Sequence, residues 1–277
     1  MKTDLYPFLV GVLFFTLMVG CSPNPVTGQK QLVLISTQQE IALGADAAPQ
    51  FEDQLGGKVP NRTLQNYVSS LGRKIAAQSE RKGVPYEFAL LASDVPNAFA
   101  LPGGKIYVTA GLMRRLTHER QLAAVLAHEV THVAARHNVM GIQRQLGSAV
   151  FVELAGWAAG EDKKKAAQAA AQITTSMFYL RYSRSDEYEA DKHGLRYMTR
   201  AGHNPWGMVE LLETLQRLND SEPGLLGEMF RTHPGTGKRI EQVKEIIEQD
   251  DSYRRYRNRR PATARSPRFN RMLKLLE

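Results

Sequence analysis

Cysteine is nearly absent from this chain of 277 residues, because Cys21 is the only one. A single cysteine excludes an intramolecular disulfide, so the fold must be held by its hydrophobic core and by any bound metal ion. Long apolar runs are also scarce, since nothing after residues 5–19 matches that first run. No internal repeat occurs either. These absences leave one sizeable domain with short appendages.

The N-terminus has the pattern of a targeting sequence. Lys2 precedes the apolar run, which is shorter than the ~20 residues that a membrane-spanning helix needs. Small residues then lead to Cys21, as in a bacterial lipobox. We therefore expect residues 1–20 to be a lipoprotein signal peptide and Cys21 to be the lipidated N-terminus; the alternative is an uncleaved anchor. Ser22 follows the cysteine, which favours a periplasmic protein held at the outer membrane.

Acidic residues are nearly absent from the C-terminal end. Between Ser252 and Glu277, nine Arg and Lys residues oppose Glu277 alone, so this segment accounts for the whole net charge of +8. The basic tail, residues 251–277, is suited to anionic lipid headgroups or lipopolysaccharide. The alternative is a solvated, partly disordered extension. Nucleic acid is not expected as a partner of an exported chain.

One apolar stretch, residues 121–133, contains the most informative motif. It includes His128-Glu129-x-x-His132. Two histidines at i and i+4 lie one turn apart on the same helical face, so both imidazoles can bind one metal ion. Glu129 can then reach a water at that metal and act as a general base. A surface helix with scattered histidines is the alternative, but the flanking residues are mostly leucine, valine and alanine.

A catalytic zinc needs at least a third protein ligand. The downstream candidates are Glu187, Glu189, Asp191, His193 and His233. Glu187 and Asp191 are four residues apart on a predicted helix and share one face, whereas Glu189 faces elsewhere. One carboxylate can bind the metal, and the other can hold a ligand histidine through its free ring nitrogen. The alternative is a solvated acidic face paired with neighbouring basic residues.

The pattern of the remaining chain predicts a mainly α fold with a small β-sheet, of the α+β class. Residues 21–35 are predicted to be a tether, and residues 36–250 a single domain. Strands are predicted at 32–35, 85–93 and 105–109, with extended chain at 97–104 closed by a turn. Predicted helices include one that begins at Ser36 or Thr37 and others at 64–79, 117–138 (capped by Thr117), 163–172, 187–200, 206–218 and 239–249.

Several segments together resemble one known family. They are Asn97-Ala-Phe-Ala-Leu-Pro-Gly-Gly, the motif of residues 128–132, Ser183-Arg-x-x-Glu-x-x-Ala-Asp191, and Thr232-His-Pro followed by Arg239-Ile. This set resembles the gluzincin metallopeptidases, which include HtpX, BepA, LoiP and the CAAX prenyl endopeptidase. The leader and Asn24-Pro-Val-Thr-Gly resemble its lipoprotein members. The membrane spans of HtpX and the tetratricopeptide repeats of BepA are not found, so the resemblance is to a minimal, LoiP-like lipoprotein form.

The resemblance implies a zincin-like domain in which the HExxH helix lies beside a short sheet. It implies a single Zn²⁺ bound by His128, His132 and Glu187, with Glu129 as the general base. Asp191 falls on the position of the residue that supports a ligand histidine.

The resemblance also assigns residues around the metal. His233 and Arg239 match residues that line the site and stabilise an oxyanion. In some relatives the histidine at the place of His233 occupies the fourth zinc position and keeps the enzyme latent. The segment that would receive substrate as an added β-strand consists of Asn97, Ala98, Phe99 and Ala100.

Two functions follow from these expectations. The first is a membrane-tethered zinc endopeptidase for misfolded or misassembled envelope proteins. The second is a chaperone or assembly factor with a structural or latent zinc site, and a scaffold that uses the basic tail is a third. Glu129 favours the endopeptidase, because a structural site needs no general base.

Overall fold

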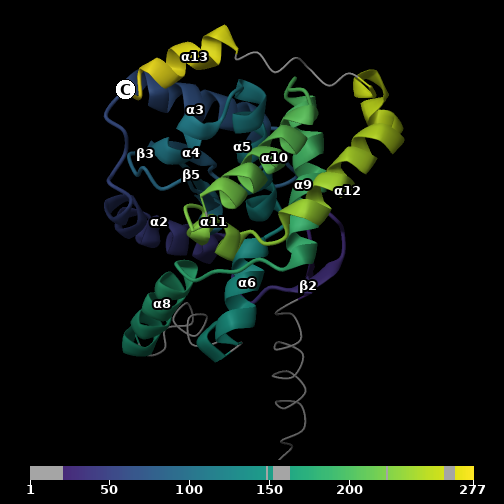
Figure 1. The fold of residues 1–277 in the computed structure, drawn as a ribbon. Coiled ribbons are helices and arrows are strands. Elements are labelled where there is room, and N and C mark those ends of the chain that lie inside the picture. Colours follow the sequence, from purple (N-terminus) through teal and green to yellow (C-terminus); the bar gives the residue numbers. More distant parts are fainter. Residues whose placement is uncertain (1–20, 148, 152–162, 223, 259–265) are drawn as a thin grey trace, which may run out of the picture.

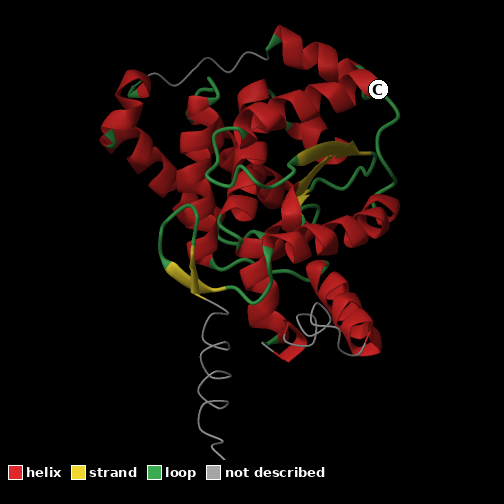
Figure 2. Cartoon of the chain, turned by 180° about the vertical axis from the view of Figure 1, so that it is seen from behind, coloured by secondary structure: helices red, strands yellow, loops and turns green. Residues whose placement is uncertain are grey.

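The computed structural model shows helices packed around a small sheet, which confirms the predicted α+β class (Figures 1 and 2). The structure describes residues 21–147, 149–151, 163–222, 224–258 and 266–277. The predicted signal peptide and residues 259–265 of the predicted basic tail lie outside the described residues. Within the described parts, every helix is too short or too polar to cross a membrane.

The central sheet has three strands in the order β3-β5-β4. Strand β3 (Glu87–Leu91) runs parallel to β5 (Lys105–Thr109), and β4 (Ala98–Ala100) runs antiparallel to β5. The segment from residue 97 to residue 104 is therefore extended chain closed by a turn, as predicted. Because β4 pairs on one side only, its other edge offers unpaired backbone groups.

Helix α5 (Glu119–Ala134) is the buried centre of the fold, because nearly every side chain in it is apolar or belongs to the metal motif. It packs most extensively against α9 and also against α10 and α3. The other helical elements are α2 (Thr37–Gln54), α3 (Arg62–Ala76), η1 (Pro102–Gly104), α4 (Ala110–Arg115), α6 (His137–Leu146), α8 (Lys163–Met177), α9 (Arg184–Arg200), α10 (Trp206–Ser221), α11 (Gly227–Thr232), α12 (Thr236–Gln249), η2 (Asp251–Tyr256) and α13 (Pro267–Lys274).

The predicted metal helix extends too far at both ends. It begins at Glu119, after His118 rather than after the predicted cap Thr117, and it ends at Ala134 rather than near residue 138. Arg136 adopts the left-handed conformation (φ 61°, ψ 28°), and α6 begins at the next residue. A left-handed arginine is not signalled by residue type, since glycine or asparagine usually takes this conformation.

The N-terminal end of the described chain forms a second, two-stranded sheet. Strand β1 (Cys21–Pro23) pairs antiparallel with β2 (Lys30–Leu32). The predicted strand at 32–35 is therefore placed too late, although Val33 and Ile35 are buried. The hairpin lies beside α6 at one end of the molecule, and α13 lies on α3 at the other end (Figure 1).

Candidate metal centre and active site

The two histidines of the motif face one another inside the fold. His128 and His132 are one turn apart on α5, and their Nε2 atoms lie 3.0 Å from each other. Both rings and the intervening Glu129 are buried. Tyr182 stacks on the His132 ring, with 3.8 Å between the ring centroids. The apolar faces of α5 therefore hold both imidazoles in one place.

Helix α9 brings two carboxylates to these histidines. Its first turn is fixed by Ser183 and Asp186, which form a reciprocal capping box. Glu187 is fully buried and lies 3.4 Å from Nε2 of His132 and 3.6 Å from Nε2 of His128. One turn later, Asp191 Oδ1 lies 3.0 Å from the opposite ring nitrogen, His128 Nδ1.

Two of the other downstream candidates for a third metal ligand lie away from the two histidines. Glu189 points to His137, with 3.2 Å between Oε1 and Nε2, and does not join the histidine pair. His193 lies in a different surface pocket with Lys192 and Arg196. The structure therefore places Glu187, and neither Glu189 nor His193, beside the histidine pair.

His233 completes the cluster from the segment between α11 and α12. Its Nδ1 is 2.9 Å from Glu187 Oε1 and 3.3 Å from His128 Nε2. Its Nε2 lies 3.7 Å from Glu129 Oε1 and has no hydrogen-bond partner among the described residues. The side chain is buried, so His233 closes the cluster on the side of Glu129.

Arg239, on α12, is engaged with both carboxylates. It donates from Nε and Nη2 to the two oxygens of Asp191, at 2.6 and 2.8 Å, and from Nη1 to Glu187. Three of its five N–H groups are thus committed to carboxylates. The guanidinium anchors the acidic face of α9 in an otherwise apolar interior.

The local environment sets the charge of the two glutamates. Burial by itself raises the pKa of Glu187, but His233, Arg239 and His128 outweigh it and hold that pKa well below its usual range. Burial also raises the pKa of Glu129, and here the nearby histidines only partly oppose it. Glu187 is therefore an ionised carboxylate suited to a cation.

The donor set fits a metal ion. One donor atom from each of His128, His132, Glu187 and His233 lies within 4.8 Å of all the others. Two buried polar atoms at this place, Glu129 Oε2 and His233 Nε2, lack hydrogen-bond partners within the part of the chain that the structure describes, although such atoms are normally paired. Imidazoles with a carboxylate are a typical catalytic zinc set.

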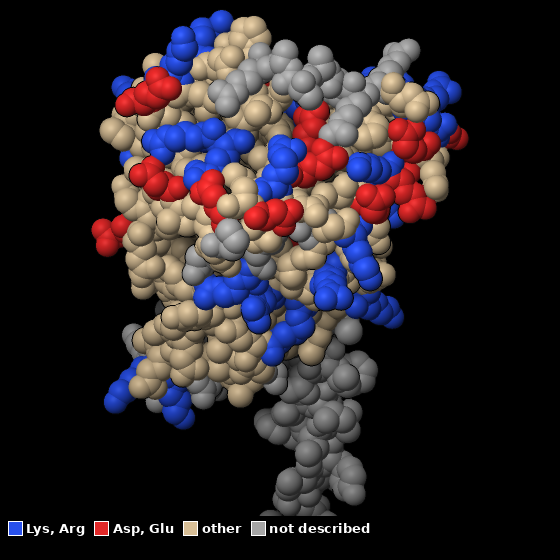
Figure 3. Space-filling view, in the orientation of Figure 1, with Lys and Arg blue, Asp and Glu red and all other residues tan. Residues whose placement is uncertain are grey.

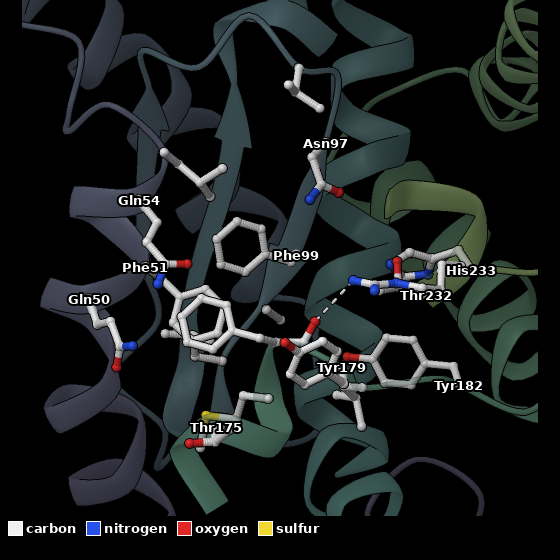
Figure 4. Close-up of a pocket in the computed structure, with 18 of the residues that line it drawn as sticks. Gln50, Phe51, Gln54, Asn97, Phe99, Thr175, Tyr179, Tyr182, Thr232 and His233 are labelled. Atoms are coloured by element: carbon white, nitrogen blue, oxygen red, sulfur yellow. Dashed lines mark hydrogen bonds between the residues drawn. The ribbon is translucent and has the colours of Figure 1, made fainter. Parts of the chain in front are cut away.

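A cleft of about 520 Å³ runs from His233 along β4. Figure 4 shows Tyr182, Thr232 and His233 at one side of this cleft and Phe99 and Phe51 at the other. The predicted substrate residues differ in orientation: Asn97 and Phe99 line the cleft, Ala100 also borders it, and Ala98 is fully buried. Residues of β4 and His233, one member of the donor set, therefore border the same cavity.

Two residues near the cluster were not singled out from the sequence. His137 forms a hydrogen bond with His132, with 3.0 Å between their Nδ1 atoms. Tyr182 stacks on His132, as described above. The spacing of five residues between the histidines is not helical, so periodicity could not relate them; only the turn at Arg136 does.

The fold and this site define the class of zincin-like metallopeptidases: a buried HExxH helix and a glutamate from a following helix converge on one metal position. The chain belongs to peptidase family M48, whose sequence profile matches residues 62–247, more than half of the chain. It is accordingly a metalloendopeptidase by class.

Three relatives illustrate the breadth of the similarity. The chain is 31% identical to the mitochondrial metalloendopeptidase OMA1 of Schizosaccharomyces pombe over 244 residues, which covers 86% of this chain and 68% of the relative. It is 29% identical to the beta-barrel assembly-enhancing protease of Escherichia coli, covering 78% of this chain but 45% of that protein. It is 25% identical to the metalloprotease LoiP of Escherichia coli, covering 87% and 96%.

Proposed function

We propose that this protein is a zinc-dependent endopeptidase of the bacterial cell envelope, with His128, His132 and Glu187 as the zinc ligands. The observation that carries this proposal is the position of Glu129. Its carboxylate is buried beside the donor cluster, and no described residue makes a hydrogen bond to its Oε2. A site built only for structure has no use for such a group.

The chain's own residues can perform the steps of peptide hydrolysis. A bound Zn²⁺ would supply Lewis acidity, which acidifies water and polarises a carbonyl group. Glu129 would take the proton of the attacking water and return it to the leaving amine. Asp191 fixes the ring of His128 through Nδ1, and Arg239 holds Asp191 and Glu187 in place.

His233 supports a latent resting state. Its position among the donor atoms is that of a fourth ligand, where it would exclude the attacking water. Displaced from the metal, the same side chain would be near enough to Glu129 to stabilise an oxyanion. This geometry also favours the second candidate function, a chaperone or assembly factor whose zinc site stays latent.

The substrate proposed is an unfolded or misassembled envelope protein. The edge of β4 can pair with an extended peptide, and the aromatic side chains beside it can accept apolar residues. Phe51 lies 5.4 Å from Phe99 and 3.7 Å from Phe178, measured between ring centroids. A relative named for the assembly of β-barrels suits such a substrate, because transmembrane β-strands alternate in hydrophobicity.

We further propose that the protein is anchored through lipidated Cys21 at the periplasmic side of the outer membrane, with the basic tail near anionic headgroups. The tail's described Arg and Lys residues are largely exposed, and Figure 3 shows basic residues at the end formed by α13. Mass spectrometry of the native N-terminus should find an acylated Cys21, and an unprocessed Met1 would contradict this.

Cleavage of casein by the purified full-length chain loaded with Zn²⁺ tests the enzymatic proposal. Glu129→Gln should keep the metal and lose hydrolysis. Glu187→Ala should bind the metal much more weakly, because it removes the charged ligand and leaves three imidazoles. The chaperone function would be favoured if neither the wild type nor the His233→Ala variant cleaved casein and the protein instead suppressed casein aggregation.

A further inference from the structure

A chain of hydrogen bonds leads from the metal cluster to the N-terminal hairpin, and the catalytic steps above do not use it. His132 Nδ1 lies 3.0 Å from His137 Nδ1, and His137 Nε2 lies 3.2 Å from Glu189 Oε1. The same carboxylate oxygen accepts a 3.0 Å hydrogen bond from Asn24 Nδ2. Asn24 belongs to the turn between β1 and β2, three residues after Cys21.

The hydrogen atoms along this path can be assigned in only one direction once His132 binds a metal. The Nε2 atom of His132 faces the other donor atoms. Its Nδ1 therefore carries the hydrogen and donates a hydrogen bond to His137 Nδ1. His137 must then be protonated at Nε2, which donates to Glu189. A carboxylate only accepts, so Glu189 suits both His137 and the amide of Asn24.

Both ends of the path are fixed by local structure. The left-handed Arg136 turns the chain between α5 and α6, which brings His137 back against His132. At the other end, Asn24 Oδ1 accepts from Val26 N at 2.9 Å, and Asn24 N donates to Gln29 O at 2.7 Å. Asn24 is therefore held by its own turn with its amide nitrogen directed at Glu189.

Three of the four members of the path are shielded from solvent, and the Glu189 side chain is 21% exposed. His132, His137 and Asn24 are 0%, 4% and 7% exposed. The nearest other carboxylate to His137 belongs to Asp186, whose Oδ1 is 3.9 Å away and whose other oxygen is bonded to Arg144. Glu189 is thus the acceptor that orients His137.

We propose that Asn24, Glu189 and His137 are positioning residues of the metal site, so that the hairpin following the lipid-attachment position sets the orientation of His132 and the affinity for metal. This rests on the proposed role of His132 as a ligand. The residues of the path do not touch substrate; they act through the ligand ring.

The test measures Zn²⁺ affinity of the full-length chain in detergent by competition with a chromophoric chelator. Outer contacts of ligand histidines typically contribute 10–100-fold to metal affinity, so His137→Ala and Glu189→Ala should weaken binding by about 10-fold or more. Asn24→Ala removes one of two donors to Glu189 and should weaken it by about 5-fold. Glu189→Gln keeps an acceptor oxygen and should restore most of the loss seen with Glu189→Ala.

Thr27→Ala is the matched control, because the Thr27 hydroxyl accepts from Gln29 N within the same turn. The substitution keeps the backbone N–H that Thr27 donates to Asn24 Oδ1. The absorption spectrum of the Co²⁺-loaded protein gives a second readout, since a reoriented His132 should change the ligand field in the Asn24 and Glu189 variants but not in Thr27→Ala. Thermal unfolding of the metal-free forms shows which variants fold.

Unchanged Zn²⁺ affinity in folded Asn24→Ala and Glu189→Ala would overturn the inference, as would an equal loss in Thr27→Ala. If Asn24→Ala does not fold, the comparison of Glu189→Gln with Glu189→Ala decides. Because affinity is measured without substrate, the pattern can hold even if casein is never cleaved. Absence of casein cleavage with this affinity pattern would contradict the proposed function but would still support the inference about the metal site.

Discussion

Glu187 is the residue at which the contacts of the site converge. His128, His132 and His233 approach it from the metal side, and Arg239 bonds to its second oxygen. Burial raises the pKa of this carboxyl, but His233, Arg239 and His128 outweigh it and hold the pKa well below its usual range, so Glu187 is ionised. His233 and Arg239 contact Glu187 in different ways, and substituting each residue in turn distinguishes their roles.

Replacing His233 by alanine should raise casein hydrolysis by the Zn²⁺-loaded chain severalfold. Activity is proportional to the fraction of molecules with an open fourth position, and the substitution removes the side chain that closes it. His193→Ala, which deletes a histidine outside the cluster, should change nothing. A fall in kcat of about 10²–10³-fold with zinc still bound would show instead that His233 stabilises the oxyanion.

Replacing Arg239 by alanine should destabilise the metal-free protein by about 3–5 kcal/mol, because it leaves Glu187 and Asp191 buried without their cation. Zn²⁺ supplies positive charge at the same place, so the loss should be smaller in its presence. Chemical denaturation of the variant and the wild type, each with and without Zn²⁺, measures both values. An equal loss in the two conditions would contradict this account of Arg239.

At the scale of elements, the position of β4 depends on a close contact between α2 and the turn that follows the strand. A Cβ atom on Gly44 of α2 would lie 1.8 Å from the carbonyl oxygen of Pro102. On the other side of the same contact, Gly103 has φ of 75° and would meet Ile41 Cα at 2.4 Å. Glu40 and Arg81, buried and doubly hydrogen-bonded, tie the same helix to the end of α5 through Val133 O.

Gly44→Ala should therefore cost stability, by about 1–3 kcal/mol as for other overpacked sites. It should also weaken casein cleavage more than Zn²⁺ binding, because the turn next to β4 moves while α5 does not. Gly83→Ala is the matched control, since its Cβ would meet no atom within 4 Å. Thermal unfolding and Zn²⁺ titration of both variants make the comparison; equal stability of the two would refute it.

At the scale of the whole molecule, the two ends of the described chain are both packed rather than free. The hairpin contacts α9 through Asn24, and α13 inserts Phe269, which is 0% exposed, into the main core. Arg268 of α13 also lies over the ring of Tyr67 on α3. The basic surface of α13 is thus presented by a helix that belongs to the domain core.

Phe269→Ala should lower the free energy of unfolding by about 3–5 kcal/mol, as large-to-small core substitutions do. Leu275→Ala is the control just beyond the end of the same helix; its side chain is 43% exposed, so its effect should stay within about 0.5 kcal/mol. Chemical denaturation of the two variants tests this. A small effect of Phe269→Ala would mean that α13 contributes little to the fold.

Local spacing in the sequence was enough to pair His128 with His132 and Glu187 with Asp191, because helical periodicity places residues four apart on one face. It also located most helices, since Ser36 and Ser183 cap helices through contacts within their first turn. These features depend on neighbours within one turn, so they can be read without knowing the fold.

The tertiary structure decided what periodicity could not reach. His137 lies five positions after His132, and the left-handed Arg136 between them brings the two rings together. The packing of α9 against α5 turned Glu187 inward and left Glu189 to His137 and the N-terminal hairpin. The contacts between α5, α6 and α9 join residues more than fifty positions apart, and the contact of the hairpin with α9 joins residues 165 positions apart. The free energy of burying the whole core, rather than any local preference, holds these segments together.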